Sequence, residues 1–128
     1  MFQTDVILDR RAAGRPVRRA APGRIISAIN LARDRAPALT LTQFLVFMAV
    51  AGEEGIRLYE LGARIGESQA VISRTVRALT TVGEPGTLPP ALGLLTLMRD
   101  RNDGRGRRAV LSPAGRTLLG QIEHALES

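Results

Sequence analysis

The chain has 128 residues, of which 45% are hydrophobic, and this predicts one domain with a sizeable core. Aromatic residues make up only 3% and cysteine is absent, so the core is expected to be aliphatic, and disulfides, thiolate metal sites and thiol redox chemistry are excluded. The formal net charge is +6, which favours a polyanionic partner, and with a single histidine no metal or cofactor is expected.

The positive charge is concentrated at the two ends of the chain. Residues 1–35 carry eight arginines and three aspartates, residues 36–98 carry four arginines and five glutamates, and residues 99–128 carry six arginines and four acidic residues. Clustered basic charge is expected of a nucleic-acid surface, although a solvated face or an acidic membrane contact produces it too. Every basic residue is arginine, which a GC-rich genome also explains, because it favours arginine codons. No apolar run has the length of a membrane span and no secretory leader pattern is present, so we expect a cytoplasmic protein.

The first part of the chain combines an arm and a short helix. Residues 1–23 are rich in glycine, proline and arginine and are predicted to be a flexible basic arm, which either lies along DNA or is an untethered tail. Residues 24–35 are predicted to form an amphipathic helix whose shared face carries Ile25, Ile29 and Ala32.

The next stretch, TLTQFLVFMAVAG (residues 40–52), predicts a strongly apolar helix. Thr42 is the expected N-cap and Gly52 the expected end. Apolar side chains cover most of the predicted helix surface, so we expect it to be deeply buried: Phe44, Leu45, Phe47, Met48 and Ala51.

Residues 57–80 are predicted to form a helix-turn-helix. A first helix ends near Gly66, and Ser68 is placed to cap a second helix by accepting a hydrogen bond from a first-turn N–H. The short joint forces the two helices to cross steeply, and Gly62 allows them to approach closely. In the second helix Ile72, Val76 and Leu79 are expected to face inward.

The remaining chain predicts a hairpin followed by a helix. A glycine- and proline-rich loop, GEPGTLPPA (residues 83–91), precedes two apolar runs of strand length, GLLTLM (93–98) and RRAVLS (107–112). The segment between the two runs is rich in turn formers and arginine. A final helix over 113–127 is expected, with Ser112 as its N-cap and proline at its first position.

This order of elements is that of a winged helix: a mainly α domain with a small β-hairpin (α+β). The domain is predicted to cover residues 24–128, with the wing at about 92–112. Arginines over 99–108 would then neutralise DNA phosphates or enter a narrow minor groove, while the second helix of the pair lies in the major groove.

From about Thr40 to Gly120 the chain resembles the MarR family of winged helix-turn-helix transcriptional regulators. The matching pieces are LYELGARIGESQAVISRTVRAL, GLL and DRNDGRGRRAVLSPAG. The resemblance implies a homodimeric regulator of double-stranded DNA, usually a repressor, that binds a near-palindromic operator. Carried over by position, the base-reading candidates are Ser68, Gln69, Ala70, Ser73, Arg74 and Arg77, and the wing candidates are Arg101, Arg105 and Arg107. In this family the residue at Asp103 often orients a wing arginine.

The chain departs from the family pattern in two places. The link TTVGEPGTLPPAL (residues 80–92) is about ten residues longer than usual, as in MarR-like proteins of phages and mobile elements, and the C-terminal helix is short. The geometry of the dimer and the existence of a small-molecule effector therefore stay open.

Other functions are weighed against this hypothesis. The sequence has no phosphate-binding loop, nucleophile elbow or metalloprotease motif, and the pair Glu53–Glu54 is interpreted as a solvated turn, so an enzyme is not expected. The alternatives are a winged-helix replication, packaging or architectural protein of a phage or mobile element, and a protein-binding winged helix.

Overall fold

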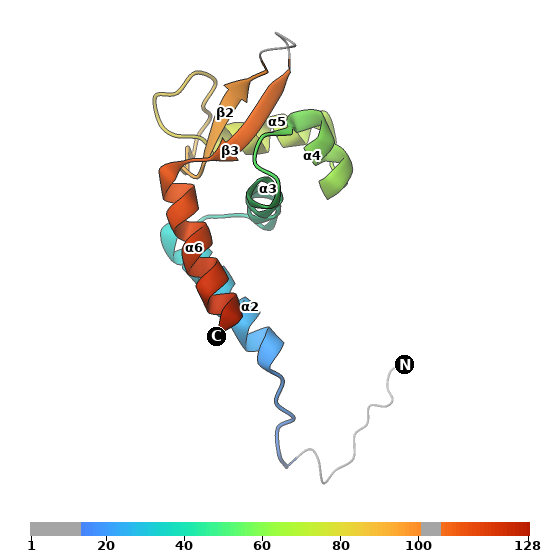
Figure 1. Cartoon of the computed structure of the whole chain (residues 1–128), viewed down its shortest axis with the longest axis vertical. Coiled ribbons are helices and arrows are strands. Elements are labelled where there is room, and N and C mark those ends of the chain that lie inside the picture. Colours follow the sequence, from blue (N-terminus) through green and yellow to red (C-terminus); the bar gives the residue numbers. More distant parts are fainter. Residues whose placement is uncertain (1–13, 101–105) are drawn as a thin grey trace.

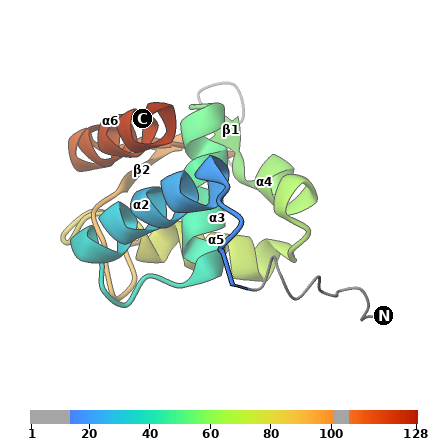
Figure 2. The same cartoon turned by 90° about the horizontal axis from the view of Figure 1, so that it is seen from below.

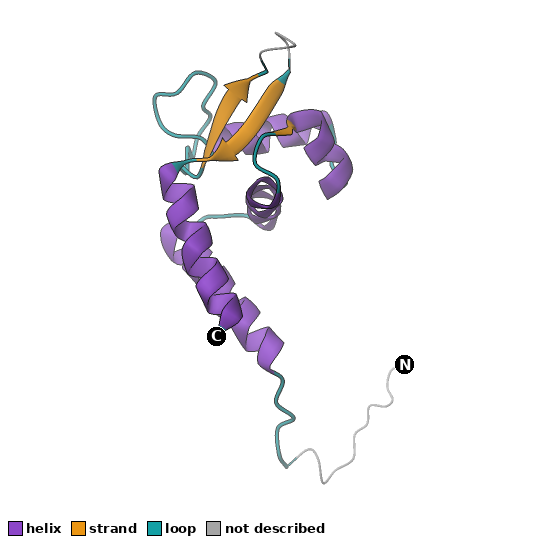
Figure 3. Cartoon of the chain, in the orientation of Figure 1, coloured by secondary structure: helices purple, strands orange, loops and turns teal. Residues whose placement is uncertain are grey.

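The computed structural model describes residues 14–100 and 106–128. In chain order its elements are α2 (Ala20–Arg35), α3 (Leu41–Gly52), β1 (Ile56–Arg57), α4 (Leu58–Ile65), α5 (Gln69–Ala78), β2 (Leu95–Arg99), β3 (Arg107–Leu111) and α6 (Pro113–Glu127). The helices α2 and α6 form one end of the molecule, and the sheet, α4 and α5 form the other (Figure 1). The predicted winged-helix architecture is confirmed, with helices predominating over a small sheet (Figure 3). In the described part of the chain, no helix is both long and apolar enough to cross a membrane.

The sheet has a strand that the sequence analysis missed. Its order is β1-β3-β2, and both pairings are antiparallel. Only Ile56 and Arg57 form β1, opposite Ala109 and Arg108 of β3. A two-residue strand has no periodicity of its own, and its partner lies about fifty residues further along the chain, so no local pattern predicts it.

The helix α3 runs through the middle of the molecule, with α2 and α6 on one side and α4 on the other (Figure 2). Its side chains Val46, Phe47 and Val50 are fully buried, as predicted for an apolar helix, whereas Leu45 is exposed. The helix begins earlier than predicted: Thr40, not Thr42, is the N-cap. Thr40 accepts a hydrogen bond from the Gln43 N–H at 3.1 Å, while the Gln43 side chain accepts one from the Thr40 N–H at 2.9 Å.

The helix α2 also begins earlier than predicted, at Ala20, so the last residues of the expected arm are helical. Pro22 is tolerated there because first-turn N–H groups have no acceptor within the helix. The predicted inward face is wrong in part. Ala32 is buried, but Ile25 and Ile29 remain 50% and 43% exposed in the single chain.

The helix α6 packs antiparallel to α2 and begins against the sheet (Figure 1). Ser112 is its N-cap, as predicted: its hydroxyl accepts from the Gly115 N–H at 3.0 Å and donates to the Gly93 carbonyl at 2.7 Å. Gly115 lies so close to the Leu94 carbonyl that no side chain fits between them. The N-terminus of α6 is thereby seated directly on the chain that leads into β2.

Candidate DNA interface

The joint between α4 and α5 is formed by a helix-ending glycine and a helix-capping serine, as the sequence predicts. Gly66 ends α4 in the left-handed region with φ of 84°, which glycine adopts without a steric penalty. Ser68 then caps α5 by accepting a hydrogen bond from the Val71 N–H at 3.2 Å. At Gly62 an added Cβ would lie 3.0 Å from the Glu67 carbonyl oxygen and even closer to the Gln69 side chain, so this glycine is required for the close crossing.

The two faces of α5 differ sharply. Ile72, Val76 and the following Leu79 are fully buried, as predicted, and anchor the helix on the core. The opposite face leaves Ala70 and Arg74 exposed and Ser73 partly exposed. Arg74 makes no hydrogen bond or ion pair with the described residues, so its five guanidinium N–H donors are available to a ligand.

Two further base-reading candidates are already engaged within the protein. The Gln69 side-chain amide donates to the Tyr59 carbonyl at 3.2 Å, which ties the start of α5 to α4. The Arg77 Nε donates to the Gly86 carbonyl at 2.7 Å, which draws this guanidinium toward the loop after α5. Arg77 also lies at the C-terminal end of the helix, whereas base contacts usually come from the N-terminal half of a recognition helix.

The hairpin of β2 and β3 carries arginine toward its tip. In the strand register Arg99 lies opposite Arg107, and both residues are exposed. They follow Leu95 and Ala109 on the face of the sheet that packs on the helices, because side chains alternate between the two faces. The wing candidates Arg101 and Arg105, together with Asp103, lie outside the described residues.

The loop end of the hairpin is held by an ion-pair cluster that the sequence analysis did not identify. The carboxylate of Asp100, only 4% exposed, lies 3.0 Å from Arg57 and 3.2 Å from Arg108. Arg108 also donates to the Gly55 carbonyl at 2.8 Å. The pKa of Arg57 is raised, first by its hydrogen bond to the Tyr59 hydroxyl and then by the Asp100 charge. The cluster joins β1 and β3 to the residue that follows β2, at the end of the strands that leads to the tip of the wing.

Comparison with known proteins finds similar folds among solved structures. No protein-family model and no curated protein matches the sequence. The PcaV transcriptional regulator from Streptomyces coelicolor, in complex with its natural ligand, is 25% identical over 70% of this chain and 56% of its own, with a TM-score of 0.54. A MarR-like transcriptional regulator from Thermotoga maritima is 18% identical over 87% of this chain and 78% of its own, with a TM-score of 0.58. Reduced AbfR bound to DNA is 16% identical over 81% of this chain and 68% of its own, with a TM-score of 0.57.

The fold is that of the MarR-type regulators. The resemblance stated from the sequence is therefore confirmed for the fold. This chain spans little more than half the length of PcaV.

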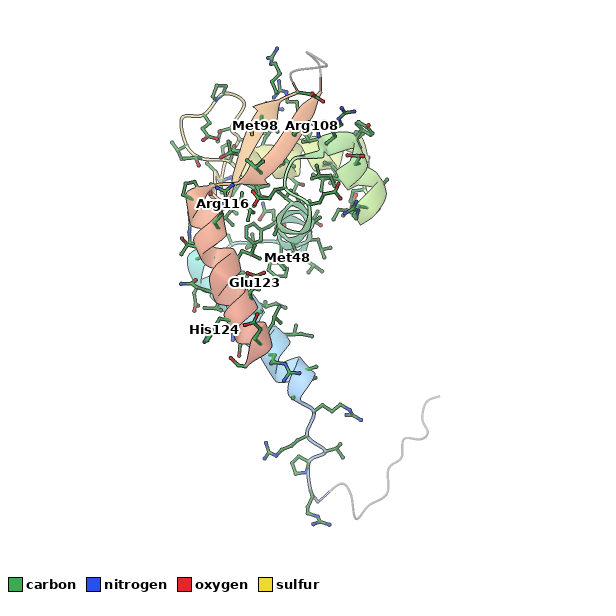
Figure 4. The ribbon with its side chains drawn as sticks, viewed as in Figure 1. Met48, Met98, Arg108, Arg116, Glu123 and His124 are labelled. Atoms are coloured by element: carbon green, nitrogen blue, oxygen red, sulfur yellow. The ribbon has the colours of Figure 1, made fainter. Side chains whose placement is uncertain are left out.

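One further prediction is corrected by the structure. The pair Glu53–Glu54 is not merely a solvated turn. Glu54 accepts a hydrogen bond from the Leu111 N–H at 2.9 Å and forms an ion pair with Arg116 at 3.0 Å, while Glu53 forms an ion pair with Arg64 at 2.8 Å. Figure 4 labels Arg116 near the start of α6, close to the sheet. The two carboxylates brace the turn between α3 and β1.

The described residues contain no group of three or more His, Cys, Asp or Glu side chains placed to hold a metal ion. The exposed arginines of the site offer hydrogen-bond donors and positive charge. These donors come from α5 and from the strands of the wing.

Proposed function

We propose that the protein is a sequence-specific regulator that binds double-stranded DNA as a homodimer and acts as a repressor. The observation that carries the proposal is the division of α5 into a fully buried apolar face and an exposed face bearing Arg74, next to an arginine-bearing hairpin. In this assignment α5 and its C-terminal continuation (69–80) read the major groove, and the wing (99–108) contacts the backbone or the minor groove.

Arg74 is the strongest candidate for reading a base. An exposed arginine on a recognition helix can donate two parallel hydrogen bonds to guanine, and a good bidentate pair contributes about 1–3 kcal/mol of discrimination. Ala70 and Ser73 lie on the same side of α5 as small residues that permit close approach or contact a base. The side-chain NH₂ group of Gln69 is bonded to the Tyr59 carbonyl. In this proposal Gln69 therefore reads adenine with its side-chain carbonyl oxygen alone.

A second copy of this chain is the proposed partner of the exposed apolar side chains on α2 and α6. Ile25, Ile26, Ile29 and Leu126 are all at least 41% exposed on the pair of antiparallel helices. Burying apolar surface contributes about 25 cal/mol per Å², so this end of the molecule gains stability from a symmetric contact. A dimer would present two recognition helices and hence bind an inverted repeat.

A solved structure with the same fold supports DNA as the partner. AbfR, with the same fold, has been solved on DNA. The match to PcaV supports a role in transcription.

The deciding experiment is a binding selection from random duplex DNA with purified protein whose mass in solution is measured first. Enrichment of an inverted repeat by a dimeric protein supports the proposal. If no repeat is enriched and binding vanishes as salt rises, the protein is instead an architectural or protein-binding winged helix.

Arg74→Ala is the variant that tests base reading. Repeating the selection should relax or abolish the preference at one position of each half-site, whereas Arg33→Ala removes the same charge from α2 and should leave the motif unchanged. An unaltered motif with Arg74→Ala would remove this residue from base recognition. Whether binding represses is then read from a promoter–reporter pair carrying the selected repeat.

A further inference from the structure

The loop that joins α5 to β2 (residues 80–93, hereafter the connecting loop) is held together by its own hydrogen bonds. The hydroxyls of Thr80 and Thr87 lie 2.8 Å apart, and the Thr87 hydroxyl lies 2.8 Å from the Thr81 carbonyl. Thr80 is buried, with its hydroxyl 2.7 Å from the Arg77 carbonyl. These contacts give the loop a defined shape of its own.

The connecting loop is also attached to the end of α5, through both the main chain and the side chain of one residue. The Leu88 N–H donates to the Arg77 carbonyl at 3.1 Å, and the Arg77 Nε donates to the Gly86 carbonyl at 2.7 Å. The Leu92 N–H donates to the Ala78 carbonyl at 2.9 Å. The position of the Arg77 guanidinium is therefore set by the loop.

The loop faces the free edge of β2 across a hollow of about 460 Å³. Its lining includes Glu84 and Gly86 from the loop, Met98 and Arg99 from β2, and Arg107 from β3. Met98 is labelled on β2 in Figure 4, and Figure 1 shows the loop rising beside this strand, at the same end of the molecule as α5 and the sheet.

Two guanidinium groups converge on Gly86 from different elements. The position that a Cβ would take at Gly86 lies 3.8 Å from the Arg77 Nε and 3.8 Å from an Arg107 terminal nitrogen. Arg107 also stands directly opposite Arg99 in the sheet. Among the described residues, neither Arg77 nor Arg107 has a carboxylate partner.

An anion between Arg77 and Arg107 would be attracted by both of their positive charges. The Arg77 Nε is used by the loop, but its terminal NH₂ groups and the Arg107 guanidinium still have hydrogen-bond donors to offer. Guanidinium groups bind phosphate oxygens through paired, charge-assisted hydrogen bonds, and Gly86 has no side chain to obstruct the approach. Glu84 is the one carboxylate in the lining and opposes such binding.

We propose that Arg77, Arg107 and the connecting loop form a binding site for a DNA backbone phosphate. The site rests on the proposed function, because α5 and the wing supply one arginine each and a duplex held by both would pass across the space between them. It assigns one backbone phosphate jointly to the end of the recognition helix and the start of β3, through the connecting loop between them. The shape of the loop is what holds the two arginines at one phosphate.

The test measures binding of the full chain to its selected duplex by fluorescence anisotropy over a series of salt concentrations. Arg107→Ala should weaken binding about threefold to tenfold for specific and nonspecific duplexes alike and lower the slope of log K against log salt by roughly 0.9, the value for one lost phosphate contact. Glu84→Gln should strengthen binding, since it removes the opposing charge. Arg33→Ala, on α2, controls for the loss of net charge.

Two further measurements separate a built site from general electrostatics. Thr87→Val changes no charge but removes the hydroxyl that shapes the connecting loop, and we expect weaker binding than wild type with unchanged far-UV circular dichroism. Replacing one phosphate at a time by a neutral methylphosphonate should reveal a single position whose effect disappears in Arg107→Ala, as expected of direct partners in a double-mutant cycle.

The proposal is overturned if Arg107→Ala and Glu84→Gln change affinity no more than Arg33→Ala does, while Arg74→Ala still alters the motif. The proposed function would then stand without this site. If the wild-type protein binds no duplex, the proposed function itself fails. Binding of a fluorescein-labelled hexaglutamate peptide that depends on Arg107, without any effect of Arg107 on DNA binding, would reassign the hollow to an acidic peptide.

Discussion

The contact between α6 and the chain leading into β2 predicts opposite effects for two glycine-to-alanine substitutions in one helix. At Gly115 an added Cβ would overlap the Leu94 carbonyl oxygen and lie 3.1 Å from its carbon and 3.4 Å from the Phe47 ring. At Gly120 nothing lies within 4 Å of the added Cβ. Both positions are inside α6, so both substitutions gain about the same helix propensity, up to ~1 kcal/mol.

For Gly115→Ala the obstacle is backbone, which cannot rotate away as a flexible side chain can. Overpacking of this kind costs about 1–3 kcal/mol and more where the backbone resists, so after the propensity gain we expect a net loss of about 2 kcal/mol. At roughly 4 °C per kcal/mol for a domain of this size, the melting temperature should fall by about 8 °C. Gly120→Ala should instead raise it by roughly 2–4 °C.

The assay is urea unfolding followed by circular dichroism at a fixed protein concentration, because a dimer's stability depends on concentration. A lower midpoint with an unchanged slope for Gly115→Ala, and a higher midpoint for Gly120→Ala, are the expected results. If the two variants unfold at the same midpoint, α6 is not seated on the Leu94 carbonyl as described, and the reasoning fails.

Three more substitutions probe contacts that hold the wing and its neighbours. Ser112→Ala should lower the free energy of unfolding by about 1–2 kcal/mol, because it removes an N-cap and leaves the partly buried Gly93 carbonyl without its hydrogen bond; Ser112→Thr, which keeps the hydroxyl, should recover part of the loss in urea titrations. Asp100→Asn should cost about 2 kcal/mol, since Arg57 and Arg108 lose their shared negative charge; a melting temperature equal to wild type would show that the cluster contributes nothing. Glu54→Gln keeps an acceptor for the β3 N–H and should cost less than ~1 kcal/mol, whereas Glu54→Ala should cost more; equal effects in thermal melts would argue against the hydrogen bond.

Elements that depend on neighbours in the chain are predictable from the sequence. The caps at Ser68 and Ser112 bind N–H groups three residues ahead, so their geometry follows once a helix begins there. The buried stripe of Ile72, Val76 and Leu79 follows from helical periodicity. The order of a helix pair, a hairpin and a helix then leaves little choice of fold.

Contacts between distant residues had to come from the tertiary structure. The strand β1 exists only because β3 pairs with it, and Glu54 acquires its role only because Leu111 and Arg116 are brought to it. The face of α2 was mispredicted for the same reason, since packing on α6 selects the alanines and leaves Ile25 outside.

The candidate site divides in the same way. Arginine in the recognition helix and wing is visible in the sequence, because charge and turn chemistry are properties of single residues and short segments. Which arginines remain available depends on partners that the fold supplies: Arg108 is taken by Asp100, Arg77 is drawn to Gly86, and Arg74 is left exposed. The sequence alone thus determined the class of fold and the kind of partner, whereas the assignment of individual side chains required the long-range hydrogen bonds and ion pairs that only folding creates.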